Sequence, residues 1–348
     1  MGISRSYKSK FGRSRYCKLE WIDMNYTKFL PIVIILIVAL VGLAIRQGKS
    51  TQDTEVSSES QNSAQTNNQS TNNSTSFIEQ LRQREFKGGE IKIEETVADN
   101  VSYTSYIFSY PSDDLTIYGR MNIPKGNGPF PVIVLNHGYF NQSSYQSGDG
   151  TQTMADILAM QDYLTLASDY RGFGKSENDL EGSRGHNPNY AIDILNLIAS
   201  VPSLDKANQR KIGMWGHSMG GEVSLRTVEA TDKIKALALW APTSGRSSDN
   251  ASFYGGRGSL RPTNNLDDDD GTSPIDFLKY ISAPISLHQG LSDTEVNPEW
   301  SKELNNALKK EGKAVEYFEY EGQDHNFRNL GWDLISERTL DFYSKNLK

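Results

Sequence analysis

The chain has 348 residues and a formal net charge of −7 at pH 7, from 36 Lys and Arg against 43 Asp and Glu. Nucleic-acid binding needs a basic surface, so this acidic balance argues against it. The single cysteine, Cys17, excludes an intrachain disulfide and a metal site built from cysteines.

The N-terminal segment is predicted to anchor the chain in a membrane. Residues 29–45 are almost wholly apolar and uncharged, which is about the shortest length that spans a bilayer. The basic residues before this segment predict, by the positive-inside rule, that residues 1–28 form a cytoplasmic tail and that the remainder is extracytoplasmic. A cleaved signal peptide is the alternative, with Met24 as the true start and Gly42-Leu43-Ala44 as the cleavage site; the protein would then be secreted.

A polar stretch follows the predicted anchor. Residues 46–76 consist mainly of Ser, Thr, Asn and Gln. Such a composition cannot bury enough apolar surface to offset the entropy lost on ordering, which predicts a disordered linker. One domain is expected over residues 77–348, beginning with a short amphipathic helix or docking arm around Phe77 and Leu81.

This domain is predicted to belong to the α/β class. Its first strands, at residues 90–97, 101–110 and 115–123, show partial apolar–polar alternation and are expected to pair antiparallel. After them, near-continuous apolar runs alternate with helical stretches. The runs are 131–135, 163–167, 211–215, 236–240, 284–287 and 315–320. Strands of this kind are buried on both faces, which predicts a mostly parallel central sheet with helices on both faces.

A G-x-S-x-G motif, Gly216-His217-Ser218-Met219-Gly220, lies between one of these runs and a helical stretch. In a strand–turn–helix context this motif presents the serine at a sharp turn, with its hydroxyl clear of the sheet. Ser218 is therefore the predicted nucleophile. The backbone N–H of Met219 is predicted to donate to the oxyanion that forms during attack.

The predicted nucleophile requires a base and an acid. A serine hydroxyl needs an imidazole to take its proton, and the imidazole needs a carboxylate to hold its tautomer. Asp293 and His325 each follow a predicted strand, which gives the chain order Ser, Asp, His at the carboxyl ends of a parallel sheet. The other histidines lie in motifs, inside a strand or in a polar loop. Glu295 and Asp324 are the alternatives for the acid.

The second oxyanion donor is expected in the loop after the first parallel strand, at Asn136-His137-Gly138-Tyr139. Gly138 permits the turn, and the backbone N–H of Tyr139 is the predicted donor. His137 is expected to hold this loop by hydrogen bonds rather than to carry a proton.

No metal or organic cofactor is expected. The acidic run at residues 267–270 departs from the spacing of a calcium loop. The glycines Gly172 and Gly174 complete no phosphate-binding motif. Arg171 is expected to form a structural ion pair, and binding of a substrate carboxylate is the alternative.

An insertion at about residues 242–281, rich in Gly, Ser and Asn, is expected to form a short lid or a wall of the site. Aromatic side chains in and beside it are the candidates to line that wall: Trp240, Phe253, Tyr254 and Phe277. The loop at residues 140–153 is the second expected determinant of specificity.

Taken together, these motifs resemble the α/β-hydrolase superfamily from about residue 86 to the end. More narrowly, the region is similar to the catalytic domain of prolyl oligopeptidase-type serine peptidases and their esterase relatives. The segments that carry the resemblance are Ser112–Gly119, Asn136–Gly138, Asp169–Gly172, Gly216–Gly221, Gly290–Asp293 and Asp324-His325. The resemblance implies an α/β-hydrolase fold and hydrolysis through an acyl-enzyme on Ser218, with Asp293 and His325.

The sequence therefore predicts a membrane-anchored, extracytoplasmic serine hydrolase that cleaves a small ester or a short peptide. The alternatives are a carboxylesterase or acyltransferase without peptidase activity, and a non-catalytic binding module at the cell surface.

Overall fold

The computed structural model describes residues 75–179, 187–255, 271–328 and 331–348. The chain divides into two units, Met1–Ser70 and Thr71–Lys348. The predicted cytoplasmic tail and membrane anchor, and all but the last residues of the predicted linker, lie outside the described residues. Within the described ranges, no helix combines the length and the apolar character that crossing a bilayer requires.

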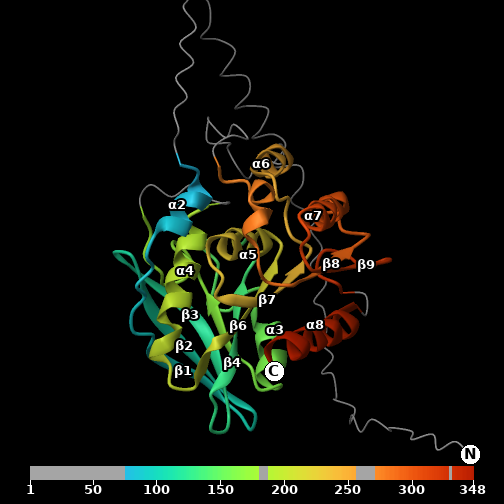
Figure 1. Cartoon of the computed structure of the whole chain (residues 1–348). Helices are drawn as coiled ribbons and strands as arrows, with labels where there is room; N and C mark the ends of the chain where they lie inside the picture. Colours follow the sequence, from blue (N-terminus) through green and yellow to red (C-terminus); the bar gives the residue numbers. More distant parts are fainter. Residues whose placement is uncertain (1–74, 180–186, 256–270, 329–330) are drawn as a thin grey trace, which may run out of the picture. The chain divides into compact units, whose positions relative to one another are not determined.

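A nine-stranded sheet forms the centre of the second unit, in the order β1-β2-β3-β5-β4-β6-β7-β8-β9 (Figure 1). The strands are β1 (Lys92–Asp99), β2 (Tyr103–Ser112), β3 (Leu115–Pro124), β4 (Phe130–Asn136), β5 (Leu164–Ser168), β6 (Ala207–His217), β7 (Ile234–Trp240), β8 (Ile285–Gly290) and β9 (Val315–Tyr320). β1, β2 and β3 pair antiparallel, and β3 pairs antiparallel with β5. All remaining pairs are parallel, so the predicted α/β class and the antiparallel N-terminal strands are confirmed.

Helices cover both faces of this sheet, as predicted. The α-helices are α2 (Phe77–Gln83), α3 (Gln152–Ala159), α4 (Tyr190–Ser200), α5 (Met219–Ala230), α6 (Ser247–Gly255), α7 (Pro298–Lys310) and α8 (Gly331–Leu347). Helices α4, α5 and α7 pack on one face, and α3 and α8 pack on the other (Figure 1).

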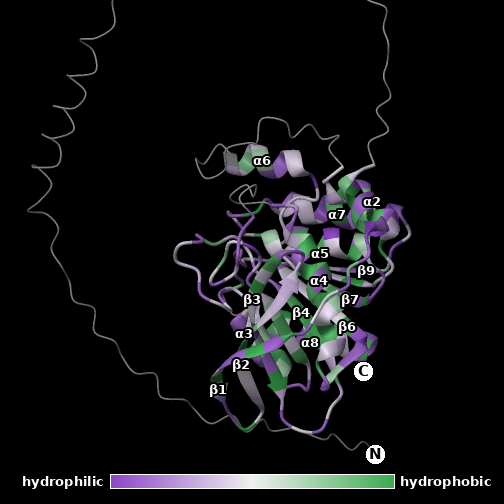
Figure 2. Ribbon diagram, turned by 90° about the vertical axis from the view of Figure 1, so that its left-hand side faces the viewer, coloured by the Kyte–Doolittle hydropathy of each residue, from purple (hydrophilic) through white to green (hydrophobic). Residues whose placement is uncertain are grey.

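Alternation along the parallel strands produces two hydrophobic cores. In β4, Val132 and Val134 face the α4–α5 side, whereas Ile133 and Leu135 face the α3–α8 side. All four side chains are fully buried. Figure 2 shows the same pattern as hydrophobic residues concentrated in the central strands. Continuous apolar runs mark the inner strands β4, β5, β7 and β8 because both faces of these strands are buried, whereas the edge strand β9 is partly exposed.

The predicted arm after the linker is the helix α2. Ser76 caps its N-terminus by accepting a hydrogen bond from the backbone N–H of Glu79 (3.3 Å). Ile78 and Leu81 are buried, and Leu81 packs against residues of α4. An amphipathic helix of about two turns is thus stabilised by docking rather than by its own propensity.

Arg171 forms the structural ion pair that its sequence context predicts. Its guanidinium donates to the buried carboxylate of Asp193 in α4 (Nη2–Oδ1, 2.7 Å) and to Asp179 (Nη1–Oδ2, 2.5 Å). The same Asp193 accepts from the Ser112 hydroxyl (2.7 Å). This network ties the loop after β5 to α4 and to the end of β2.

The insertion between β7 and β8 contributes α6 and the 3-10 turns η3 (Pro274–Asp276) and η4 (Leu278–Tyr280). Residues 256–270, with the acidic run, lie outside the described residues. Of the four aromatic residues proposed to line the site, Trp240 and Tyr254 do so. The prediction is wrong for the other two, because Phe253 packs on Trp300 and Phe277 stacks on Tyr280.

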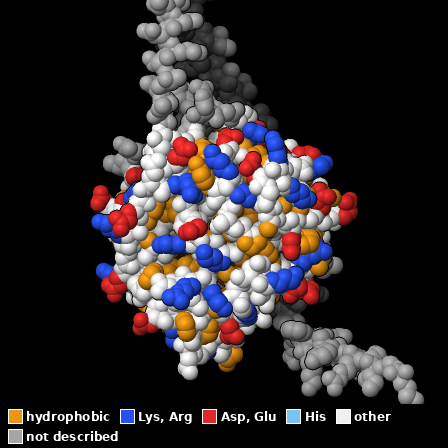
Figure 3. Space-filling view, viewed as in Figure 1, with side chains coloured by type: hydrophobic (Ala, Val, Ile, Leu, Met, Phe, Trp, Pro, Cys, Tyr) orange, Lys and Arg blue, Asp and Glu red, His pale blue; other side chains and the backbone are white. Residues whose placement is uncertain are grey.

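The surface over α2, α4 and α7 shows no separation of charge by sign. On the face in Figure 3, acidic and basic side chains are interspersed with small apolar patches. This face therefore carries no extended field of one sign that would select a polyanion or polycation.

Candidate active site

Ser218 occupies a strained turn between β6 and α5. Its backbone angles are φ 57° and ψ −125°, a conformation that a non-glycine residue adopts only when its surroundings impose it. Here the Ser218 N–H donates to the Trp240 carbonyl (3.1 Å), and the Ser218 carbonyl accepts from the N–H groups of Gly221 (2.9 Å) and Thr243 (3.1 Å). These hydrogen bonds fix the turn, and Ser218 stays partly accessible at the end of the strand.

The glycines of the motif are required by close backbone contacts. A Cβ at Gly220 would lie 2.0 Å from the carbonyl oxygen of Asn136 in β4. A Cβ at Gly216 would lie 2.4 Å from the carbonyl oxygen of Gly220. Neither position can hold a larger residue without a shift of the backbone, which explains the G-x-S-x-G spacing in this chain.

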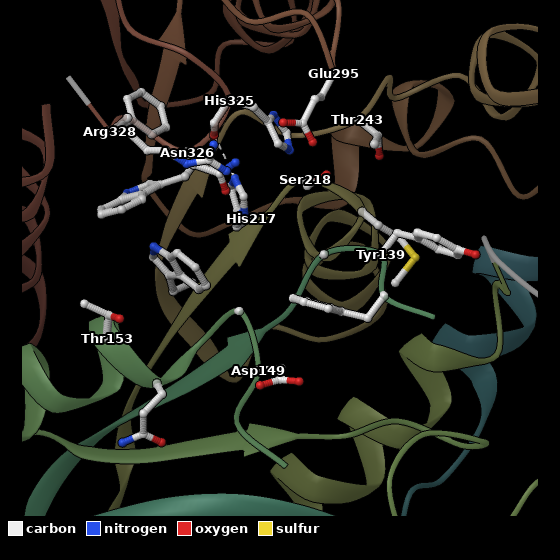
Figure 4. A pocket seen from close by; sticks show the side chains of 18 of the residues that line it. Tyr139, Asp149, Thr153, His217, Ser218, Thr243, Glu295, His325, Asn326 and Arg328 are labelled. Atoms are coloured by element: carbon white, nitrogen blue, oxygen red, sulfur yellow. Dashed lines mark hydrogen bonds between the residues drawn. The ribbon is translucent and has the colours of Figure 1, made fainter. Parts of the chain in front are cut away.

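His325 and Asp293 come together from the loops after β9 and β8. His325 Nδ1–H donates to Asp293 Oδ2 at 2.8 Å, and both side chains are nearly buried. This hydrogen bond places the proton of the neutral ring on Nδ1 and leaves Nε2 as the acceptor. His325 and Ser218 line the same cavity (Figure 4).

Several further donors converge on Asp293. Its Oδ1 accepts from the backbone N–H groups of Glu295 (2.8 Å) and Val296 (2.9 Å), and its Oδ2 also accepts from Gln289 Nε2 (3.2 Å). Burial raises the pKa of Asp293. The hydrogen bonds from His325 and from the two backbone N–H groups together lower it by more, so the pKa lies below its ordinary value of 3.8. The carboxylate is therefore ionised at neutral pH and accepts the hydrogen bond from the imidazole.

The two alternative acids, Glu295 and Asp324, make other contacts. The backbone of Glu295 supports Asp293, and its side chain faces the cavity. Asp324 Oδ1 accepts from the backbone N–H groups of Asn326 (3.1 Å) and Arg328 (3.0 Å), which fixes the turn that carries His325. Among the three candidates, Asp293 is the carboxylate bonded to the imidazole.

His217 contacts His325, a contact that the sequence did not predict. His217 Nε2 lies 3.0 Å from the carbonyl oxygen of His325, and the two ring centroids are 4.6 Å apart. A carbonyl oxygen can only accept, so His217 carries its proton on Nε2. Burial first, and then the neighbouring His325, lower the pKa of His217 to about 3, which keeps this ring neutral. The only signal in the sequence is a histidine at the variable position before the serine.

The loop after β4, which carries Gly138 and Tyr139, also approaches Ser218. A Cβ at Gly138 would lie 3.1 Å from the Ser218 Cβ, so the backbone at Gly138 and Tyr139 passes directly beside the serine. Met219 is the first residue of α5, and first-turn N–H groups have no acceptor within their own helix. The two predicted oxyanion donors therefore belong to the residue after Gly138 and to the residue after Ser218. The Tyr139 side chain also lines the cavity and is 51% exposed.

His137 lies beneath this loop, in agreement with its predicted scaffold role. Its Nδ1 is 2.6 Å from the Gly138 carbonyl oxygen and its Nε2 is 3.3 Å from that of Asp169. Burial lowers the pKa of His137 to about 4, so the ring is neutral and has one proton for two carbonyl groups. The shorter contact favours donation to Gly138. Rings of Tyr145 and Tyr170 pack on either side within 4.7 Å and 4.3 Å between centroids.

A cavity of about 830 Å³ opens at this end of the sheet. Its walls come from the loop after β4, the ends of β6 and β7, the insertion and the turn at His325, as seen in Figure 4. The charged side chains that line it are Asp149, Glu295 and Arg328, and its apolar wall includes Phe140, Trp215, Trp240, Phe327 and Trp332. The size matches pockets for small organic ligands. The described part of the chain holds no group of three or more His, Cys, Asp or Glu side chains arranged to bind a metal ion.

Known proteins resemble parts of this chain in sequence. The family described as serine aminopeptidase, S33, matches residues 128–256. An uncharacterized 31.7 kDa protein from Escherichia coli is 26% identical over 117 residues, which are 33% of this chain and 38% of that protein. The chain thus spans about a third of the length of the first curated relatives it matches.

Two solved structures illustrate the likeness in three dimensions. The acylaminoacyl peptidase of Pyrococcus horikoshii aligns with a TM-score of 0.59 and 20% identity, over 76% of this chain and 51% of that one. The acetyl xylan esterase of Paenibacillus sp. R4 aligns with a TM-score of 0.59 and 19% identity, over 78% of this chain and 92% of that one. At this identity the likeness establishes the fold, and the predicted fold class is confirmed.

Proposed function

We propose that this chain, a member of the α/β-hydrolase superfamily, is a serine hydrolase that cleaves an ester or short-peptide bond through an acyl-enzyme on Ser218. The observation that carries the proposal is the strained turn at Ser218 in one cavity with a His325–Asp293 pair. A binding module has no need of a strained serine in one cavity with an imidazole whose tautomer is fixed by a carboxylate.

The chemistry follows from the order of contacts. His325 Nε2 takes the proton of Ser218 as Oγ forms a bond to the substrate carbonyl carbon. The N–H groups of Tyr139 and Met219 stabilise the resulting oxyanion. His325 then gives its proton to the leaving alcohol or amine, the bond to that group breaks, and a serine ester remains. Water, deprotonated by His325, attacks this ester; the bond to Oγ breaks, His325 returns the proton to Oγ, and the acid is released.

The choice between peptidase and esterase is the finer question. The comparisons include both classes, with a family described as serine aminopeptidase and a neighbour described as an acetyl xylan esterase. The cavity of about 830 Å³ has the size of a pocket for a small molecule, which favours esters and short peptides over long chains.

The test is a panel of p-nitrophenyl esters of increasing chain length alongside aminoacyl and prolyl p-nitroanilides. We expect cleavage of at least one class and a loss of about a millionfold in turnover for Ser218→Ala. Faster anilide cleavage supports the peptidase, and cleavage of short esters alone supports the esterase. Acyl transfer is identified by adding an alcohol and detecting the new ester. Turnover that survives Ser218→Ala would overturn the proposal.

We also propose that residues 29–45 hold the enzyme at the cell membrane with its catalytic domain outside the cytoplasm. Support comes from the uncharged apolar run and the basic residues before it. Fractionation of cells that express the full chain is expected to find it in membranes, with the domain accessible to added protease. A soluble extracellular product that lacks residues 1–44 would instead indicate a cleaved signal peptide.

A further inference from the structure

Glu295 stands out among the charged residues of the cavity. It follows Asp293 by two residues, and its backbone N–H is fixed to Asp293 Oδ1 (2.8 Å). Its backbone carbonyl accepts from the Tyr254 hydroxyl (3.2 Å). The two hydrogen bonds attach Glu295 to the acid of the triad on one side and to the insertion on the other.

The Glu295 side chain points into the cavity on the side of His325 and Ser218 (Figure 4). Within the described ranges, no Lys or Arg forms an ion pair with its carboxylate. The other two charged groups of the wall, Asp149 and Arg328, lie away from Ser218 in the same view. Arg328 also has an acidic neighbour, since its Nε is 4.0 Å from Asp324 Oδ2.

A carboxylate at this place has a cost for catalysis. The attack on a carbonyl develops a negative charge beside Ser218, and a nearby anion disfavours it. A cationic group on the substrate would offset that repulsion and find an anionic partner at the same time. An acid that opposes one class of substrate and attracts another is a means of selection.

The position of the acid indicates which part of the substrate it meets. His325 gives its proton to the leaving group, so the leaving group passes beside the His325 ring. Tyr139, a predicted oxyanion donor, lies on the opposite side of Ser218 from His325 in Figure 4. Glu295 and the Tyr254 ring, which both line the cavity, are therefore expected to face the leaving group. A carboxylate and an aromatic face together suit an ammonium group.

We propose that Glu295 selects substrates whose leaving group carries a positive charge, such as an ester of an amino alcohol or of a quaternary ammonium alcohol. This inference rests on the proposed function of Ser218, His325 and Asp293. It also implies that a leaving group with a free carboxylate, such as a C-terminal amino acid, is disfavoured.

The test compares two esters of one acid that differ only in charge, the choline ester and its carbon isostere, the 3,3-dimethylbutyl ester. Wild type is expected to favour the choline ester in kcat/KM by about five- to tenfold, a value above that of a fully exposed ion pair because the substrate excludes water. Glu295→Gln is expected to abolish the preference. Asp149→Asn, the matched control on the far wall, is expected to retain it. Added salt is expected to reduce the preference of wild type.

A second measurement does not depend on turnover. Phosphonate probes with a thiocholine leaving group and with its neutral thiol isostere are compared for their rates of reaction with Ser218. Wild type is expected to react faster with the cationic probe, and Glu295→Gln is expected to react equally with both.

The outcomes distinguish a failure of the role proposed for Glu295 from a failure of the proposed hydrolase function. Equal preference in wild type and Glu295→Gln, with both substrates cleaved through Ser218, overturns the role of Glu295 and leaves the hydrolase intact. An equal loss for both esters in Glu295→Gln shows a supporting role toward His325 and likewise overturns the selection of cations. Failure of both probes to modify Ser218 in the folded protein overturns the proposed function and this inference with it.

Discussion

The two sides of Ser218 each contain a histidine and a buried aspartate, yet the two carboxylates behave in opposite ways. On the side of the base, Asp293 accepts from His325, Gln289 and two backbone N–H groups, and its pKa lies below the ordinary value. On the oxyanion side, Asp169 accepts from the hydroxyls of Tyr145 and Ser147. Burial raises the pKa of Asp169 to about 6, and the two hydroxyls only partly offset it.

The two pKa values diverge because Asp169 is the more deeply buried acid (0% exposed, against 7% for Asp293) and because Asp293 has more donors, the His325 ring among them. An ionised carboxylate beside the His325 ring stabilises the imidazolium that forms during the reaction. Beneath the oxyanion loop, the Asp169 carboxylate meets hydroxyl donors rather than an imidazole. There His137 contacts backbone carbonyls, and its pKa of about 4 keeps it neutral.

The largest contrast is expected from replacing each acid by its amide. Asp293→Asn removes the acceptor that fixes the His325 tautomer and is expected to lower kcat by about ten-thousandfold. Asp169→Asn alters only the scaffold of the loop, and we expect a loss of less than about tenfold. Steady-state kinetics on the best ester substrate measures both. Equal losses would show that the two sides are not functionally distinct.

A smaller loss is expected at His217, whose N–H holds the carbonyl of His325. His217→Phe keeps a ring but removes the donor, so His325 loses a positional restraint and kcat is expected to fall about ten- to a hundredfold with little change in KM. His217→Gln retains an N–H donor and is the matched control, expected to recover most of the activity. A loss in His217→Gln as large as in His217→Phe would point to ring packing instead of the hydrogen bond.

The smallest effect is on stability and concerns the pKa of Asp169. Because this pKa is raised from 3.8 to about 6 in the folded protein, the group favours folding at low pH and this contribution is lost as the pH rises through 6. Asp169→Asn cannot titrate. The melting temperature of the variant relative to wild type is therefore expected to be higher at pH 7.5 than at pH 4.5. The same difference at both pH values would contradict the raised pKa.

Much of the fold was predictable because the sheet is buried on both faces. Uninterrupted apolar runs such as 131–135 identify parallel strands, and the glycines around Ser218 mark the turn. The pairing of Asp293 with His325 agrees with the chain order of the motifs. These features could be predicted from local sequence patterns, because each depends on one strand and the few residues after it.

Other features depend on contacts between distant segments and left no local pattern. The hydrogen bond from His217 to the His325 carbonyl joins residues 108 positions apart. Phe253 was expected to line the cavity because it is an aromatic residue in the Gly-, Ser- and Asn-rich insertion. Its side chain instead packs on Trp300 of α7. Which side of an insertion faces the site follows from how it folds back on the domain, and the sequence of the insertion alone does not determine it.

The central claim is that His325, held by Asp293, activates Ser218. Treatment of the folded protein with a fluorophosphonate, followed by mass spectrometry of its peptides, measures this directly. We expect one adduct, on Ser218, absent from Ser218→Ala and formed much more slowly in His325→Gln. A folded protein that stays unmodified, or one whose Ser218 reacts as fast without His325, would contradict the account.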